Sequence, residues 1–252
     1  MNTLLILGSK PEPALPTPAS YEEVACANGS GYSAASHHLP RPAFTVMTPV
    51  IASGIESGRQ SLQALTGLST GTVYFLYRRD EGKRGFARFL HYLKTFREKP
   101  AYRMQPFYLK KMLRSVSYHH DELVALRPAE YDTLVERLCD WDAEVCSQLL
   151  RKRPSTGIIA LALAIDRQKY QRYILSGFSF ELTHSYAPNP VIEKRGTTDS
   201  SHANTDVMVV GYLARKLGNV FTTEETVHER AGVPFLPGYL QGGRQNHESA
   251  GP

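Results

Sequence analysis

The sequence predicts an α/β domain built on a mostly parallel β-sheet. Short apolar runs that stop at turn residues alternate along the chain with segments of helical periodicity, which is the order that βαβ units produce. The chain has 252 residues, of which 42% are hydrophobic and 21% are charged, so it can bury a core and has a globular composition. We therefore expect one domain over residues 1–240 and a disordered tail over residues 241–252, which are rich in Gly, Gln and Ser.

Strands are expected where a short apolar or β-branched run ends in turn residues, because buried strands of a parallel sheet have this pattern. The expected strands are Thr3–Leu7, Val24–Ala27, Phe44–Met47, Thr72–Tyr77, Tyr173–Leu175 and Asn219–Thr223. Helices are expected where apolar residues recur at helical spacing or, for Ile158–Ile165, cover all sides of a buried helix. The other expected helices of this frame are Gly54–Leu65 and Asp206–Leu217, the second with Gly218 as its C-cap.

Residues 78–152 are predicted to form a helical insertion in this frame. Residues 78–114 contain twelve Lys and Arg residues and seven aromatic residues but only three acidic residues. The apolar residues from Phe86 to Phe96 fall at helical spacing, which predicts an amphipathic helix that ends before Pro100. A longer helix is expected over Pro128–Arg151. The basic surface fits a solvated helix face, contact with an anionic membrane surface or a protein partner; no recognisable nucleic-acid module carries it.

Net charge, the length of apolar runs and cysteine spacing limit the classes of protein to which this chain can belong. The net charge of +5 favours an anionic partner. No apolar run approaches the about 20 residues of a membrane span, and the N-terminus lacks the basic start of a secretory signal. We therefore expect a cytoplasmic protein, with peripheral contact to the inner face of the membrane left open. The three cysteines show no CxxC spacing, so neither a disulfide framework nor a zinc site is indicated; they are Cys26, Cys139 and Cys146.

Small and polar residues stand at the ends of several expected strands. In an open parallel sheet, ligands bind beyond the carboxyl ends of the strands, where glycine permits close approach and hydroxyl and amide groups form hydrogen bonds. The same residues also make ordinary turns. The chain contains neither GxGxxG nor GxxxxGK(S/T), so neither a dinucleotide-binding enzyme nor a P-loop NTPase is indicated. The strand-end groups are Gly8-Ser9, Asn28-Gly29-Ser30, Thr48, Ser155-Thr156-Gly157 and Ser176-Gly177.

His202 is a candidate general base between an expected lid, residues 181–201, and the helix that follows. Imidazole takes up a proton near neutrality, and a carboxylate such as Asp206 would orient it. In the purely structural alternative, Asn204 or Thr205 caps the helix and Asp206 lies in its first turn.

Three stretches of the sequence resemble the bacterial CMP-sialic acid-dependent sialyltransferases. They are Ser155–Ala164, Tyr173–Phe180, and His202 with Thr205-Asp206, which occur in the family's order and at similar spacing. The resemblance implies a single Rossmann-like domain, a GT-A variant with a small lid, that uses a CMP-sugar donor and a glycan or glycolipid acceptor. Related transferases on a comparable frame use CMP-Kdo.

The resemblance also implies roles for individual residues. His202 would be the base and Tyr186 would bind the phosphate. A retaining variant would need a carboxylate nucleophile, for which Glu181 is the nearest candidate in the sequence. Ser179 stands where the family has aspartate, the first turn lacks the family's asparagine, and the spacing from His202 to Asp206 is one residue shorter. The candidate substrate-binding residues are Gly8, Ser9, Lys10, Asn28, Gly29, Ser30, Thr48, Ser155, Thr156, Gly157, Ser176, Gly177, Phe178, Tyr186 and Asn204.

The predicted function is transfer of an ulosonic acid, Kdo or sialic acid, from its CMP donor to a cell-surface glycan, without a metal or other cofactor. The departing CMP carries a single phosphate, whose charge backbone N–H groups, Lys10 and lid groups can offset. Asp140-Trp141-Asp142 resembles a DxD metal motif, but we expect it mid-helix, where the two carboxylates face different ways. The alternative is a non-catalytic nucleotide- or glycan-binding domain of a larger polysaccharide synthase. Nucleic acid is not an expected partner.

Overall fold

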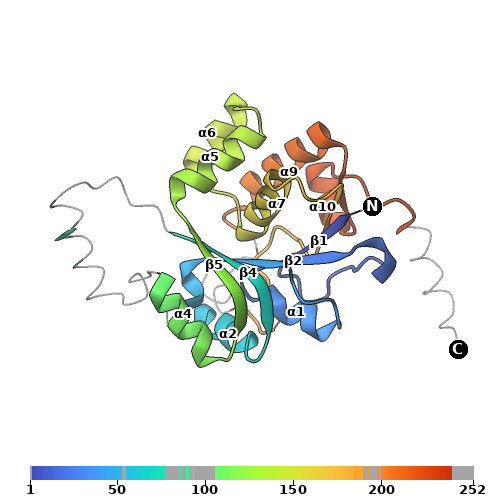
Figure 1. The fold of residues 1–252 in the computed structure, drawn as a ribbon. Coiled ribbons are helices and arrows are strands. Elements are labelled where there is room, and N and C mark those ends of the chain that lie inside the picture. The colour runs from blue at the N-terminus through green and yellow to red at the C-terminus, as the bar shows by residue number, and fades with distance from the viewer. Residues whose placement is uncertain are drawn as a thin grey trace, which may run out of the picture.

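A computed structural model describes residues 2–52, 55–77, 106–184, 186–189 and 200–239, together with the isolated positions 86, 89, 90, 93, 192 and 198. Its centre is a seven-stranded sheet in the order β5-β4-β3-β2-β1-β6-β7, in which all six neighbouring pairs are parallel (Figure 1). The strands are β1 (Thr3–Leu7), β2 (Glu23–Ala27), β3 (Phe44–Met47), β4 (Ser69–Leu76), β5 (His119–Leu126), β6 (Arg172–Ser176) and β7 (Val220–Thr222).

Helices cover both faces of the sheet. In Figure 1, α5, α6, α7, α9 and α10 lie on one side and α1, α2 and α4 on the other, which gives three layers. This arrangement is the one that right-handed crossovers between parallel strands produce. The helices are α1 (Gly31–Ser36), α2 (Glu56–Ala64), α4 (Pro106–Ser115), α5 (Pro128–Leu138), α6 (Ala143–Arg151), α7 (Thr156–Asp166), α9 (Ala203–Leu217) and α10 (Glu225–Ala231), and short 3-10 turns follow β2 and β3.

The central strands and α7 form the main core. All five residues of β1 are buried, as is every α7 residue from Thr156 to Ile165, and α7 packs across β1, β2 and β3. The apolar sequence of this helix had predicted its burial, and the structure confirms it. On the opposite face, Met47, Phe75 and Leu109 belong to a second buried cluster under α4. The expected parallel α/β fold is therefore confirmed.

The middle of the chain differs from the predicted helical insertion. It contains β5, which extends the sheet beside β4 with the register Val73↔Leu123. This strand was not predicted because its first residues are polar. His119, Asp121 and Glu122 are exposed, as is common on a strand at a sheet edge. Most of the expected amphipathic helix of residues 86–96 lies outside the described residues.

The helix expected over Pro128–Arg151 is two helices, α5 and α6. The chain turns between them because Asp140 and Trp141 adopt left-handed conformations, with φ of 53° and 56°. The Asp142 side chain then caps α6 by accepting hydrogen bonds of 3.0 Å from two backbone N–H groups. The Asp-Trp-Asp motif thus lies in a turn rather than mid-helix, and the Asp140 side chain forms an ion pair with Lys216 at 2.6 Å.

Two further helices, α1 and α10, were not predicted because each is shorter than the window in which helical periodicity is visible. The other boundaries differ by a few residues: β4 begins at Ser69 and α9 begins at Ala203. Within the described residues, no helix is both long enough and apolar enough to cross a membrane.

Candidate functional site

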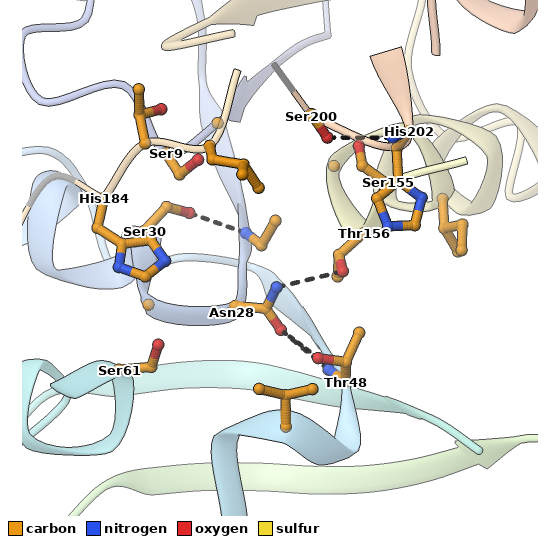
Figure 2. A pocket seen from close by; sticks show the side chains of 18 of the residues that line it. Ser9, Asn28, Ser30, Thr48, Ser61, Ser155, Thr156, His184, Ser200 and His202 are labelled. Carbon is orange, nitrogen blue, oxygen red and sulfur yellow. Dashed lines mark hydrogen bonds between the residues drawn. The ribbon is translucent and has the colours of Figure 1, made fainter. Parts of the chain in front are cut away.

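The carboxyl edge of the sheet holds a cavity of about 490 Å³ (Figure 2). The ends of β1, β2, β3 and β6, the amino ends of α7 and α9, and residues 179–184 form its wall. Segments that are far apart in the sequence meet here because parallel strands all end at the same edge. The predicted residues that line it are Gly8, Ser9, Asn28, Gly29, Ser30, Thr48, Ser155, Thr156, Gly157, Gly177, Phe178, Glu181, Tyr186 and His202.

Three of the predicted site residues do not line this cavity. The ammonium group of Lys10 lies 2.6 Å from the buried carboxylate of Glu224, which holds it away from the cavity. Ser176 is fully buried, and its hydroxyl donates to the carbonyl oxygen of Ala14 at 2.8 Å. Asn204 is exposed on α9. All three residues are close in sequence to residues that line the cavity. Hydrogen-bond partners elsewhere in the fold hold Lys10 and Ser176 away from it, and Asn204 lies on the exposed face of its helix.

Asn28 connects three of the segments that form the wall. Its Oδ1 accepts hydrogen bonds from the Thr48 backbone N–H at 2.9 Å and the Thr48 hydroxyl at 3.2 Å, and its Nδ2 donates to Thr156 Oγ1 at 3.2 Å (Figure 2). The backbone N–H can only donate, so it fixes the orientation of the amide. The residue has φ of 49°, a left-handed conformation that asparagine tolerates better than most residues. One side chain therefore sets the relative positions of β2, β3 and α7.

The ends of β1 and β6 approach each other so closely that glycine is required. A Cβ atom on Gly8 would lie 2.2 Å from the carbonyl oxygen of Gly177, and Gly177 itself has φ of 73°. The Gly8 N–H donates to Ser176 O at 2.8 Å, and the Lys10 N–H donates to Gly177 O at 2.9 Å. Glycine at these two positions lets the two backbone segments approach each other closely at this part of the cavity wall.

Aromatic rings form another part of the wall. The Tyr186 ring packs on Gly29, where a Cβ atom would lie 2.5 Å from the ring, and its hydroxyl is hydrogen-bonded to Ser61. The His184 ring stacks on Tyr186 with centroids 4.9 Å apart. Burial raises the pKa of Tyr186 and lowers that of His184, so both rings are neutral near pH 7. Phe178 packs in the same way on Gly157.

His202 lies at the amino end of α9, with its ring beside Ser155 and Thr156 (Figure 2). Its Nδ1 is 2.7 Å from the backbone carbonyl oxygen of Arg153, which can only accept, so Nδ1 carries the hydrogen and Nε2 holds the free lone pair. Burial lowers the pKa of His202, which favours the neutral base. The expectation that a carboxylate orients this ring was wrong, since a main-chain carbonyl does so.

Asp206 instead binds the start of α7. Its Oδ1 accepts the Ser155 backbone N–H at 2.6 Å, and only 4% of the residue is exposed. Burial raises the pKa of this carboxyl group to about 7. The cap expected from Asn204 or Thr205 is also absent from α9: its N-cap is His202, which makes no side-chain cap hydrogen bond. Thr205 is buried and donates to the carbonyl oxygen of Lys152 at 3.0 Å.

Arg153 lines the cavity and was missed by sequence reasoning. Its guanidinium group forms an ion pair with Asp132 at 3.0 Å and lies 5.0 Å from the centroid of the Tyr131 ring, and Tyr131 also lines the cavity. Its position two residues before the Ser155-Thr156-Gly157 turn was the available signal, but a single arginine in a basic sequence does not stand out. The structure shows that this cation is held at the cavity wall.

The segment expected to be a lid is described only in part. Glu181 lines the cavity, and its carboxylate accepts a hydrogen bond from the Thr198 hydroxyl at 3.5 Å. The Leu182 N–H donates to Thr198 O at 2.7 Å, so the two ends of this segment lie close together. Within the described residues, no group of three or more His, Cys, Asp or Glu side chains could hold a metal ion.

The fold of this chain is similar to that of several solved structures. No family model matches the chain, and no curated protein matches it significantly. A solved structure of a variant of the sialyltransferase CST-II in complex with CMP is similar, with a TM-score of 0.56, 13% identity, and coverage of 95% of this chain and 88% of that chain.

Two further solved structures show the same similarity. CST-II in complex with a trisaccharide acceptor and CMP has a TM-score of 0.53, 13% identity, and coverage of 94% of this chain and 87% of that chain. The monofunctional α-2,3-sialyltransferase Cst-I from Campylobacter jejuni has a TM-score of 0.52, 12% identity, and coverage of 93% and 81%. The chain therefore has the same fold as these sialyltransferases.

Proposed function

We propose that this protein is a metal-independent glycosyltransferase that moves an ulosonic acid, sialic acid or Kdo, from its CMP donor to a glycan acceptor. The observation that carries the proposal is the convergence of the β1, β2, β3 and β6 ends and the start of α7 on one cavity that His202 borders. A fold shared with sialyltransferases solved with CMP, and in one case with a trisaccharide acceptor, supports the same donor and acceptor classes.

The parts of the cavity suit the parts of such a donor. The amino end of α7 presents backbone N–H groups and the positive end of the helix dipole, which stabilise a phosphate without a metal. Asn28 and Thr48 offer amide and hydroxyl groups at the ends of β2 and β3, where hydrogen bonds to a base or ribose can form. Tyr186 also lines the cavity; its neutral hydroxyl is hydrogen-bonded to Ser61 and would exchange this partner for the phosphate.

His202 acts as the general base in the inverting version of this reaction. The acceptor hydroxyl oxygen attacks the anomeric carbon, the bond from that carbon to the CMP oxygen breaks, and the hydroxyl proton passes to Nε2. CMP leaves with the bonding electron pair. The Arg153 carbonyl supports the imidazolium through Nδ1–H, 2.7 Å away. A retaining version would use Glu181 as the nucleophile, and its carboxylate lies in the cavity wall.

Selective stabilisation by cytidine nucleotides tests the donor class. CMP and CTP are expected to raise the melting temperature, because a ligand of the native state stabilises it by about 2.7 kcal/mol at 100 times its dissociation constant. UMP, UDP, GMP, AMP and NAD serve as controls in the same thermal-shift experiment and should give little change. A preference for a uridine diphosphate or NAD would contradict the proposal. Binding of CMP without transfer from a CMP-sugar would favour the alternative, a non-catalytic nucleotide- or glycan-binding domain of a polysaccharide synthase.

We also propose a cytoplasmic location with peripheral contact to an anionic membrane, where a glycolipid acceptor would lie. Phe86 and Phe89, three residues apart, are 71% and 55% exposed and lie with their rings 6.2 Å apart, within the stretch that is rich in Lys and Arg. Cosedimentation with phosphatidylglycerol vesicles is expected, weakened by salt and by replacing both residues with Ser. Equal binding to neutral phosphatidylcholine vesicles would contradict this contact with an anionic membrane.

A further inference from the structure

The first turn of α9 binds the main chain that leads into α7. Three of its side chains are hydrogen-bonded to backbone groups within residues 152–155, and all three come from one helical turn, so they act on that segment together. Figure 2 shows His202 of this turn beside Ser155 and Thr156 at the cavity wall. The bonds are Thr205 Oγ1 to Lys152 O at 3.0 Å, His202 Nδ1 to Arg153 O at 2.7 Å, and Asp206 Oδ1 to the Ser155 N–H at 2.6 Å.

The Asp206 carboxyl group occupies an unusual electrostatic position in this turn. It lines the cavity but is only 4% exposed, and it forms no salt bridge within the described part of the chain. Arg153, the cation that lines the cavity in the described part of the chain, is paired with Asp132 at 3.0 Å, and the lowered pKa of His202 keeps its imidazole neutral near pH 7. Lys152 lies on the same segment, and its charge acts on His202. Burial accordingly raises the pKa of Asp206 to about 7, so both of its forms are available near neutrality.

We propose that Asp206 is a positioning residue: its carboxyl group joins the amino end of α7 to the turn that carries His202, and it becomes the neutral acid when an anion occupies that end of the cavity. The anion is the phosphate of the donor, so this inference rests on the proposed function. Both forms of the acid accept the Ser155 N–H through an oxygen atom. Only the ionised form repels a phosphate at the start of α7.

The sign of the pH dependence follows from this linkage. Binding of a phosphate favours the protonated form of Asp206, so the protein takes up a proton when CMP binds. The affinity for CMP should therefore fall as pH rises above about 7, by up to tenfold per pH unit in the limit where the acid must be fully protonated. Cytidine, which has no phosphate, should bind with no such dependence.

Two substitutions separate the charge of Asp206 from its hydrogen bond. Asp206→Asn keeps an oxygen acceptor for the Ser155 N–H but has no titrating group, whereas Asp206→Leu removes the acceptor. We expect D206N to bind CMP with a smaller fall in affinity between pH 6 and pH 8.5 than the wild-type protein, and D206L to bind weakly at every pH. The ratio of wild-type to D206N affinities at each pH cancels the titration of CMP itself. Asp166→Asn, an exposed ion-pair residue at the other end of α7, is the matched control and should follow the wild type.

Transfer kinetics test whether the residue positions His202 as well as the phosphate site. D206L should lower kcat and raise KM, because both the imidazole and the start of α7 lose a common support, and D206N should restore kcat. Isothermal titration in two buffers of different ionisation enthalpy measures the proton uptake directly. The wild type should take up a fraction of one proton at pH 7 and D206N should take up less.

A ligand-free measurement keeps this inference separate from the proposed function. The folded pKa of Asp206 lies above that of an unfolded aspartate, so its contribution to stability is present at pH 4 and is lost as pH rises through about 7. The stability of the wild type relative to D206N should fall over that range. Identical pH profiles of CMP affinity in the two proteins would overturn this inference alone. Failure to bind CMP at all would overturn the proposed function and this inference with it, while leaving the stability difference in place.

Discussion

Replacing His202 by Ala is expected to lower turnover by about 10²- to 10⁴-fold while the protein still binds CMP. The variant loses Nε2, the nitrogen left free to accept a proton by the hydrogen bond from Nδ1 to Arg153 O. It keeps the ends of β1, β2, β3 and β6, which form other parts of the cavity wall. The measurement is transfer from a CMP-sugar under saturating donor, with CMP affinity determined in parallel.

A matched control is available in His228 on α10. Its Nδ1 also lies near a backbone carbonyl oxygen, that of Val233 at 2.8 Å, but the residue lies outside the cavity wall. His228→Ala should leave turnover unchanged. Because burial lowers the pKa of His202, the neutral base should persist to lower pH, and the acidic limb of kcat/KM should fall below the usual histidine range. Equal losses in the two variants would contradict a catalytic role for His202.

Replacing Glu224 by Ala is expected to have the largest effect on stability, lowering the free energy of unfolding by about 3–5 kcal/mol. The side chain is 2% exposed and accepts three hydrogen bonds. Its removal leaves two backbone N–H groups and an ammonium group without their partner, and it frees the turn that follows β1. The donors are Lys10 Nζ at 2.6 Å, the Ala14 N–H at 2.8 Å and the Gly177 N–H at 2.7 Å.

Two milder substitutions resolve this effect into its parts. Glu224→Gln retains a carbonyl oxygen for the backbone N–H groups and should be less damaging than the alanine variant. Lys10→Met removes the ammonium but keeps the carboxylate and its two backbone donors. Urea unfolding monitored by circular dichroism gives the free energies. A Glu224→Ala protein as stable as the wild type would show that the buried carboxylate is dispensable.

The sequence was sufficient to predict the parallel frame because each central strand is a short, fully buried apolar run. Phe44–Met47 was predicted with its observed bounds, and Val24–Ala27 was one residue short. β5 was missed because its first four residues are polar and its apolar second half, residues 123–126, is only partly buried. The break between α5 and α6 depends on left-handed residues and on one capping aspartate, which periodicity does not reveal.

The lining of the cavity could be predicted where position along a strand decides it. Residues at the carboxyl ends of parallel strands share one edge, so Asn28 and Thr48 could be expected to meet. Lys10 could not be placed, because its partner Glu224 lies 214 residues away and no local pattern indicates that pairing. The carbonyl oxygen that orients His202 belongs to the backbone of Arg153, a group that every residue possesses, so residue type carried no signal for it.

The link from Asn28 to Thr48 and Thr156 also bears on how the protein matures during synthesis. The bond from Asn28 to Thr48 can form as soon as both residues have been synthesised. Thr156 and the first turn of α9 are synthesised much later. A nascent chain released before residue 206 would have several strands but an incomplete cavity wall. If CMP is added to ribosome-bound chains, its protection of the chain from proteolysis should therefore appear late during elongation, after α9 has left the ribosome.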